Sequence, residues 1–372
     1  MLLKNGQLYF EGKLQPMSLR FEGDTITEIA PALAGQGEDC SDCLVIPGFV
    51  DIHSHGCKGL DFCTANDEEM DTMCRFYADN GVVGVAATGM TLAPQTLTDI
   101  FAKIGHKAAK GTDGAAIIGI NMEGPFISEG KKGAHDAQYI IPPTAALLRE
   151  LNQASGGRIL LVDVSPTAEG ALEFIRAVKD EVVVSLAHTP ADYDTAMTAI
   201  EAGASNITHL YNAMQPFAHR APGLIGAAFD SNVTAELICD GIHSHPCAIR
   251  TAFKMLGERA VLISDSMSAA GMPDGDYLLG GLAVTVEKRK AFLADGTIAG
   301  STITVYDGFR NAVRFGVGLE QAIHAATTAP AKAARLSSRY GTLAVGRKAD
   351  VLVLDKETLA LRKVIIGGKQ HV

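Results

Sequence analysis

The chain has 372 residues, of which 47% are hydrophobic and 20% are charged, and its formal net charge is −10. This composition is typical of a compact globular protein with a large core, and it argues against a disordered chain. The acidic excess, without any basic run, argues against a nucleic-acid partner and against an anionic membrane partner. It is compatible with a small anionic substrate that is held by a few local cations.

The beginning of the chain lacks the apolar segment of a secretory signal, and no uncharged stretch reaches the length of a membrane span. The seven cysteines show no spacing typical of a disulfide framework. Cys40 and Cys43 form an isolated C-x-x-C pair, which we interpret as incidental. We therefore expect a cytoplasmic protein whose thiols are reduced.

Both ends of the chain have a pattern of short strands. Residues 1–45 contain three apolar segments separated by Gly and Pro, and residues 336–372 contain two more. The segments are 7–10, 17–21, 25–29, 351–355 and 363–366. The pattern predicts one small β-sandwich domain assembled from the two termini.

Between these ends, residues 46–335 alternate apolar strands with helical segments. Eight such units predict a parallel (β/α)8 barrel, with a β insertion near 278–299 after the eighth strand. An open doubly wound sheet is the alternative, but it normally carries a Gly-rich phosphate turn after its first strand, and none is present. The expected strands are 44–52, 82–88, 116–122, 159–164, 182–187, 204–208, 234–238 and 260–264. The expected helical segments include 67–80, 94–110, 143–154, 169–179, 192–202 and 246–257.

The first barrel strand ends in His53-Ser54-His55. Alternation along a strand puts these two imidazoles on the same side, where they can bind a divalent metal. A bare H-x-H is equally compatible with two ordinary histidines in a turn. Further candidate ligands elsewhere in the chain favour the metal interpretation.

These further candidates also follow expected strands, and catalytic groups of such barrels lie at the carboxyl ends of the strands. They are Glu123, His188, His209 and Asp265. Each alone could be structural, and Asp265 could be a helix N-cap. Together they predict a site for zinc or ferrous iron, in which Asp265 accepts a proton from the attacking water.

The motifs around these residues carry a family resemblance that runs nearly end to end. They include Pro47–Gly56, Glu123–Phe126, Lys132–His135, Ala187–Thr189, Thr208–Met214, Asp240–His243, Ser264–Met267 and Gly341–Asp350. The chain resembles the amidohydrolase superfamily, and within it the deacetylases that act on N-acetylhexosamine 6-phosphates. Glu-Gly-Pro and His-Leu-Tyr-Asn-Ala-Met in one chain are specific motifs.

The resemblance implies a ligand set. Glu123, His188 and His209 would be the main metal ligands, and His53 and His55 would hold a second metal or stand beside an empty site. One or two metals per subunit, Zn²⁺ or Fe²⁺, are therefore expected. Many superfamily members bridge two metals with a modified lysine after strand 4. No lysine occurs there in this chain, and Glu123 takes that place.

The resemblance also implies the substrate contacts. Ala134 and His135 would contact the substrate, and His135 would polarise the acetyl carbonyl. Asp265 would act as the general base and then as the general acid. Arg220 and His243 would bind the sugar phosphate, with Arg220 reaching the site of the neighbouring subunit of a homodimer. Further implied contacts are the backbone amides of Asn212 and Ala213 and the loop of Ile298, Ala299 and Gly300.

The activity implied is hydrolysis of the acetamide of N-acetylglucosamine 6-phosphate in amino-sugar catabolism, with the galacto epimer as the alternative substrate. More remote alternatives are another amidohydrolase reaction and a non-catalytic scaffold. The missing lysine, together with Arg220 and His243, disfavours the first, and the complete set of ligand positions disfavours the second.

Overall fold

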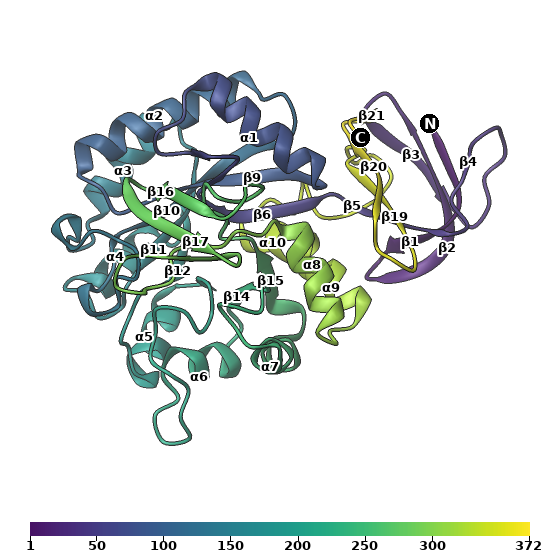
Figure 1. Cartoon of the computed structure of the whole chain (residues 1–372). Coiled ribbons are helices and arrows are strands. Elements are labelled where there is room, and N and C mark those ends of the chain that lie inside the picture. The colour runs from purple at the N-terminus through teal and green to yellow at the C-terminus, as the bar shows by residue number, and fades with distance from the viewer.

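The computed structural model describes all 372 residues, and its centre is a barrel of eight parallel strands surrounded by helices (Figure 1). The strands follow one another around the barrel in chain order. Their bounds are β6 (Phe49–Ser54), β9 (Val82–Gly89), β10 (Ala116–Phe126), β11 (Ile159–Val164), β12 (Val183–Leu186), β13 (Asn206–Ile207), β14 (Thr234–Ile238) and β15 (Ala260–Ile263).

The last strand of the barrel returns to the first. The backbone N–H of Asp265 donates to the carbonyl oxygen of His53 at 2.9 Å, and Ser54 forms a parallel bridge with Ser266. The hydroxyl of Ser264 also donates to the carboxylate of Asp51. These contacts close the sheet, and the predicted (β/α)8 barrel is confirmed.

Helices cover the outside of the barrel (Figure 1). In α1, for example, Asn66 and Glu69 form a capping box, and Met70, Met73 and Tyr77 supply the buried face. The bounds are α1 (Asp67–Asp79), α2 (Pro94–Lys110), α3 (Ala145–Ala154), α4 (Ala171–Val178), α5 (Tyr193–Ala202), α6 (Gly223–Asp230), α7 (Pro246–Leu256), α8 (Val305–Arg314), α9 (Leu319–Ala326) and α10 (Thr328–Ala333). Three short 3-10 helices are η1 (Glu129–Lys131), η2 (Ala137–Tyr139) and η3 (Gly257–Arg259). None of these helices is long and apolar enough to span a membrane.

The two termini build a separate sheet beside the barrel (Figure 1). Its order is β21-β20-β19-β5-β1-β2-β3, with β4 paired to β1, and it encloses a core of its own. The bounds are β1 (Leu2–Phe10), β2 (Lys13–Glu22), β3 (Thr25–Ala30), β4 (Glu38–Asp39), β5 (Cys43–Pro47), β19 (Val351–Asp355), β20 (Leu361–Ile366) and β21 (Lys369–Gln370). A β unit made from both termini is confirmed, whereas the domain boundaries at 45/46 and 335/336 stay predictions.

The expected single strand at 44–52 is wrong, because the structure divides it between the two sheets. Strand β5 pairs with β1 and β19, whereas β6 pairs with β9 in the barrel. The change occurs at Pro47-Gly48. Pro47 has no N–H to continue a ladder, and a Cβ on Gly48 would lie 2.2 Å from Cγ1 of Val83. Only glycine lets the chain pass this close to β9.

The region of the expected β insertion, near 278–299, holds a small sheet after the eighth barrel strand, and this sheet begins earlier than residue 278. It is a three-stranded antiparallel sheet of β16 (Gly275–Leu279), β17 (Leu282–Glu287) and β18 (Lys290–Phe292). A small hairpin of β7 (Gly56–Cys57) and β8 (Leu60–Asp61) follows the first barrel strand. All seven cysteines are free, including Cys40 and Cys43.

Replacing Gly48 with alanine tests the crossing between the two sheets. We expect G48A to lower the free energy of unfolding by about 1–3 kcal/mol, because the new methyl group overlaps the side chain of Val83. Urea denaturation measures the change. Gly130→Ala is the control, since its added Cβ meets nothing within 4 Å. Equal stability of G48A and the unchanged protein would contradict the close approach.

Candidate active site and metal centre

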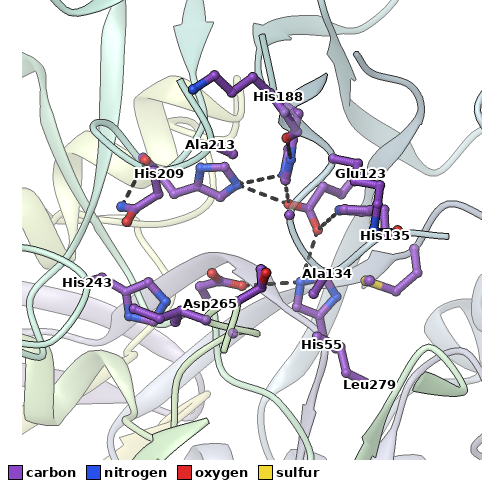
Figure 2. Close-up of a pocket in the computed structure, with 18 of the residues that line it drawn as sticks. His55, Glu123, Ala134, His135, His188, His209, Ala213, His243, Asp265 and Leu279 are labelled. Atoms are coloured by element: carbon purple, nitrogen blue, oxygen red, sulfur yellow. Dashed lines mark hydrogen bonds and ion pairs between the residues drawn. The ribbon is translucent and has the colours of Figure 1, made fainter. Parts of the chain in front are cut away.

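The candidate residues meet at the carboxyl end of the barrel. His53 is the last residue but one of β6 and His55 follows this strand, Glu123 lies in β10, and His188, His209 and Asp265 follow β12, β13 and β15. A cavity of about 520 Å³ opens above them (Figure 2). It is lined by His55, Met90, Glu123, Glu129, Gly130, Lys131, Lys132, Gly133, Ala134, His135, His188, His209, Asn212, Ala213, His243, Asp265, Leu279, Asp295, Thr297, Ile298 and Gly300.

Three of these residues have an unusual backbone conformation. The φ angles of His188, His209 and Asp265 are 43°, 30° and 47°, in the left-handed region that non-glycine residues seldom adopt. Each residue lies two positions after the end of a barrel strand, and its side chain lines the cavity. Strain of this kind is concentrated at functional sites.

The first cluster of candidate ligands consists of Glu123, His188 and His209 (Figure 2). Oε1 of Glu123 lies 3.0 Å from Nε2 of His188 and 3.1 Å from Nε2 of His209, and the two Nε2 atoms are 3.1 Å apart. Donor atoms about 2.0–2.1 Å from a tetrahedral zinc ion are roughly 3.3 Å from one another. The spacing of the three atoms fits a common divalent metal.

Hydrogen bonding fixes the tautomer of His188. Its Nδ1 lies 2.9 Å from the carbonyl oxygen of Lys131, so Nδ1 carries the proton and donates it. The lone pair of Nε2 then faces Glu123 and His209, as a metal ligand requires. In His209 the Nδ1 atom is buried without a hydrogen-bond partner.

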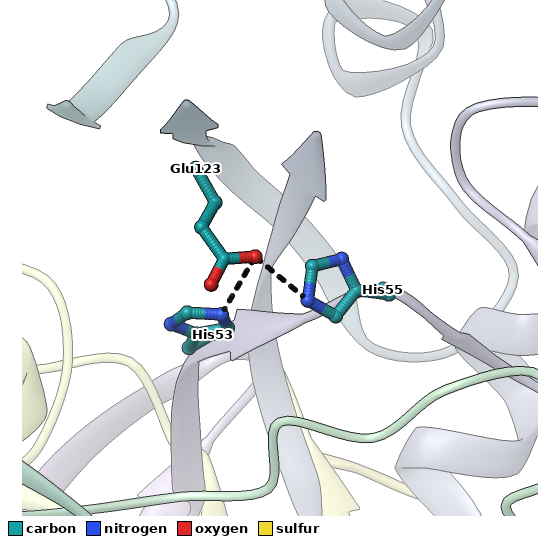
Figure 3. Close-up of side chains that lie close together, drawn as sticks. All are labelled: His53, His55 and Glu123. Carbon is teal, nitrogen blue, oxygen red and sulfur yellow. Dashed lines mark ion pairs between the residues drawn. The ribbon is translucent and has the colours of Figure 1, made fainter. Parts of the chain in front are cut away.

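The second cluster gathers around the other oxygen of Glu123 (Figure 3). Oε2 lies 3.1 Å from Nε2 of His55 and 3.6 Å from Nε2 of His53. Oδ1 of Asp265 lies 3.2 Å and 3.6 Å from the same two nitrogens. Nε2 of His53 is fully buried and has no hydrogen-bond partner. Buried polar atoms normally have a partner, and a metal ion bound by this nitrogen would supply one. The donor set of imidazoles and carboxylates suits zinc or iron.

His135 has a different environment from these ligands. The backbone N–H of Thr91 donates to its Nδ1 at 3.2 Å, so a neutral ring carries its proton on Nε2. Burial lowers the pKa of His135 to about 4, against the opposing charge of Glu123. The imidazole is therefore neutral near pH 7 and offers an N–H to an acceptor in the cavity.

Glu236 is a polar contributor that the sequence analysis missed. Its side chain is fully buried inside the barrel on β14. Oε2 accepts hydrogen bonds from Nδ1 of His53 at 3.1 Å and from the backbone N–H of His209 at 3.3 Å, and Oε1 accepts one from Asn206 at 2.8 Å. It holds His53 with the Nε2 lone pair toward the cluster. A polar residue in the apolar strand Thr-Ala-Glu-Leu-Ile was the signal available in the sequence.

Other sequence-predicted residues differ in where they lie. Asn212, Ala213, His243, Ile298 and Gly300 line the cavity, as do Ala134 and His135. Ala299 is fully buried and does not line it, because alternation along the segment turns its side chain inward. Arg220 is exposed in the loop before α6 and does not line the cavity of its own chain.

A parallel barrel with imidazoles and carboxylates converging at its carboxyl end defines a metal-dependent hydrolase of the amidohydrolase type. The chain belongs to the amidohydrolase family, whose model matches residues 44–371.

Individual relatives match over nearly the full length. The chain is 36% identical to N-acetylglucosamine-6-phosphate deacetylase of Bacillus subtilis (strain 168), over 99% of this chain and 93% of the relative. It is 35% identical to N-acetylgalactosamine-6-phosphate deacetylase of Escherichia coli O157:H7, over 96% of each chain. Among solved structures, a mutant N-acetyl-D-glucosamine-6-phosphate deacetylase of Mycobacterium smegmatis in complex with N-acetyl-D-glucosamine-6-phosphate has a TM-score of 0.94 at 34% identity. That alignment covers 100% of this chain and 99% of the other.

Glu236→Gln tests whether this carboxylate prepares the metal centre. A glutamine side chain has only one oxygen, so it cannot accept hydrogen bonds from both His53 and Asn206. Its NH2 group would face the N–H of one of these two residues. We expect metal affinity to fall by about 10–100-fold, with less than the normal metal per subunit after dialysis against buffered zinc. Elemental analysis measures the metal, and Glu201→Gln on the exposed face of α5 is the control. Normal metal content in Glu236→Gln would contradict the positioning role.

Proposed function

We propose that the protein hydrolyses the acetamide of N-acetylglucosamine 6-phosphate to glucosamine 6-phosphate and acetate, in amino-sugar catabolism. The observation that carries this proposal is the convergence of Glu123, His188, His209 and Asp265 beside a neutral His135 in one cavity. The names of the full-length relatives support the same reaction. The galacto epimer is the alternative substrate, because one full-length relative bears that name.

The proposed metal ligands follow from the two clusters. Glu123, His188 and His209 are the main ligands of a divalent metal, Zn²⁺ or Fe²⁺, and their mutual distances of 3.0–3.1 Å support this set. His53 and His55, with the second oxygen of Glu123, have the donors for a second metal. A bound divalent metal supplies a Lewis acid for the carbonyl group and lowers the pKa of the attacking water.

Asp265 moves the proton in the proposed reaction. Burial raises the pKa of Asp265, but the charges and hydrogen bonding of His55 and His53 outweigh it, so the pKa lies below its usual value. The carboxylate is therefore ionised and accepts the proton of the attacking water. It then returns this proton to the departing amine.

His135 stabilises the charge that develops on the acetyl oxygen. Its Nε2–H is directed toward the centre, 3.6 Å from Oε2 of Glu123, and its ring is held by Thr91. As the carbonyl carbon becomes tetrahedral, its oxygen gains negative charge and the hydrogen bond from Nε2–H becomes stronger. A neutral donor with a fixed tautomer requires no reorganisation during this step.

We assign the phosphate of the substrate to the side of the cavity that His243, Asn212 and Ala213 line. Nδ1 of His243 pairs with Oδ2 of Asp240 at 2.7 Å, which leaves Nε2 for the phosphate. Burial lowers the pKa of His243, and Asp240 outweighs this effect and raises it. Asn212 and Ala213 line the same side, and the backbone N–H of Ala213 is not used within the chain. Ala134, Ile298 and Gly300 complete the proposed substrate contacts, and Ala299 is not among them because it does not line the cavity.

We further propose a homodimer in which Arg220 reaches the site of the other subunit. Arg220 does not line its own cavity, and it is exposed in the segment before α6. The loop between β13 and α6 projects from the barrel (Figure 1). An arginine fork matches the geometry of a phosphate group.

A cytoplasmic location also stays a prediction, and so does the absence of nucleic-acid and membrane partners.

The substrate proposal is tested by acetate release from N-acetylglucosamine 6-phosphate, its galacto epimer and the two unphosphorylated sugars. We expect the gluco 6-phosphate to be the best substrate by kcat/KM. Loss of the phosphate should lower kcat/KM by orders of magnitude, because the charge-assisted hydrogen bonds to it are lost. A galacto preference would transfer the mechanism to the alternative substrate. No acetate from any sugar, in protein loaded with metal, would contradict the deacetylase proposal.

Mixing two inactive variants tests the shared site. We expect Asp265→Asn and Arg220→Ala each to lose most activity as homodimers. After joint unfolding and refolding of equal amounts, half of the dimers are mixed, and each mixed dimer holds one complete site. The mixture should regain about a quarter of the wild-type activity. Asp265→Asn should keep nearly normal metal content. No gain on mixing, with mixed dimers demonstrated by tags, would place both residues in the site of the same subunit.

A further inference from the structure

The apolar residues of the cavity are concentrated at one end. Five of the lining residues are hydrophobic, and three of these are almost completely buried, namely Met90, Ala134 and Leu279, which are 3%, 8% and 2% exposed. The other two, Ala213 and Ile298, are more exposed. The buried three therefore form a small apolar surface inside a cavity that is otherwise polar.

This apolar surface lies beside the carbonyl-polarising histidine. Ala134 directly precedes His135, and Met90 directly precedes Thr91, whose N–H donates to Nδ1 of His135 at 3.2 Å. The turn after Leu279 packs on Met90, since a Cβ on Gly280 would lie 2.7 Å from Cγ of Met90. Ala134 and Met90 are thus linked to His135 directly or through Thr91, and Leu279 is linked to it through Met90.

The position of Leu279 is fixed by hydrogen bonds of its turn. The backbone N–H of Gly280 donates to Oδ2 of Asp61 at 2.9 Å. Asp61 is buried, and its neighbour Phe62 donates its backbone N–H to the carbonyl oxygen of His55 at 2.9 Å. The tip of the β16–β17 hairpin is therefore tied to the segment that carries a candidate metal ligand. Figure 2 shows Leu279 next to His55, with His243 on the far side of Asp265.

The geometry of an amide then determines what meets this surface. The three substituents of the acyl carbon lie in a plane and point in three directions. If the oxygen faces His135 and the nitrogen leads toward Asp265 and the sugar on the side of His243, only the methyl group remains. It points toward the end formed by Met90, Ala134 and Leu279.

We propose that Met90, Ala134 and Leu279 form an acyl pocket that receives the methyl group of the acetyl and limits the length of the acyl chain that is removed. This assignment rests on the proposed deacetylase function. The surface is apolar, so it favours a hydrocarbon group over a charged or hydroxylated one. It is held by the anchored hairpin turn, so an additional methylene meets a wall that does not yield.

The test is a series of N-formyl, N-acetyl and N-propionyl glucosamine 6-phosphates, with release of the free amine as the readout. Wild-type protein is expected to prefer acetyl over propionyl by about tenfold or more in kcat/KM. Leu279→Ala makes room for the extra carbon, so the propionyl-to-acetyl ratio should rise at least about tenfold. Leu279→Val should shift it by a smaller factor, and Leu279→Phe should retain formyl turnover while losing acetyl turnover.

Leu278→Ala is the matched control. Leu278 belongs to the same hairpin, but it is 56% exposed. Its side chain lies on the opposite face of the strand from Leu279. Its ratio should stay within about twofold of the wild-type ratio. Metal content and thermal unfolding identify any variant that fails to fold, and Leu279→Val is the conservative variant for that case.

Two negative results have different meanings. An unchanged propionyl-to-acetyl ratio in folded, metal-loaded Leu279→Ala and Leu279→Val, with wild-type turnover intact, would overturn the acyl pocket alone. Absence of amine release from all three substrates by wild-type protein would overturn the deacetylase function and the acyl pocket with it.

Discussion

Glu123 is surrounded by imidazoles, and each of its carboxylate oxygens faces a different set. Oε1 approaches His188 and His209, whereas Oε2 approaches His53 and His55. Burial raises the pKa of Glu123, and the surrounding histidines lower it well below the usual value. A buried carboxylate without such partners would be costly, so the barrel must bring the ends of three other strands, β6, β12 and β13, to within a few ångströms of this one side chain. The rest of the site depends on that convergence.

The barrel interior beneath Glu123 is polar as well, and this explains how the candidate ligands keep their orientation. Glu236 accepts hydrogen bonds from His53 and from the backbone of His209, so one carboxylate supports both clusters. Asp51 accepts hydrogen bonds from Ser264 and from the backbone of His53 at the point where the barrel closes. The contacts that close the sheet therefore also help to position the candidate ligand His53.

The cavity above this centre divides into regions of different chemistry. His243 and Ala213 occupy a polar side, His135 and Asp265 lie beside the candidate ligands, and Met90 and Leu279 line an apolar end. Loops from the carboxyl ends of the strands supply most of these residues, and the insertion after β15 supplies Leu279. The scaffold is thus common to many barrels, whereas most of the residues that line this cavity come from its loops.

The sequence by itself determined the architecture and the chemistry of the candidate centre. Continuous apolar strands alternating with helical segments predicted the barrel, and the polar residues after those strands identified His53, His55, Glu123, His188, His209 and Asp265. These inferences succeed because the period of a strand and the carboxyl-end rule are local properties of the chain. The β unit from both termini was predicted for the same reason.

Only the tertiary structure decided how these residues combine. It divided the predicted first strand at Pro47-Gly48, because the close approach to Val83 involves residues far apart in the chain. It brought Glu236 under His53, 183 positions away, and it placed Leu279 beside the site through the contact of Gly280 with Asp61. It also gave His188, His209 and Asp265 their left-handed backbones. Such long-range contacts leave no periodic pattern in the sequence, since they arise only when the barrel closes.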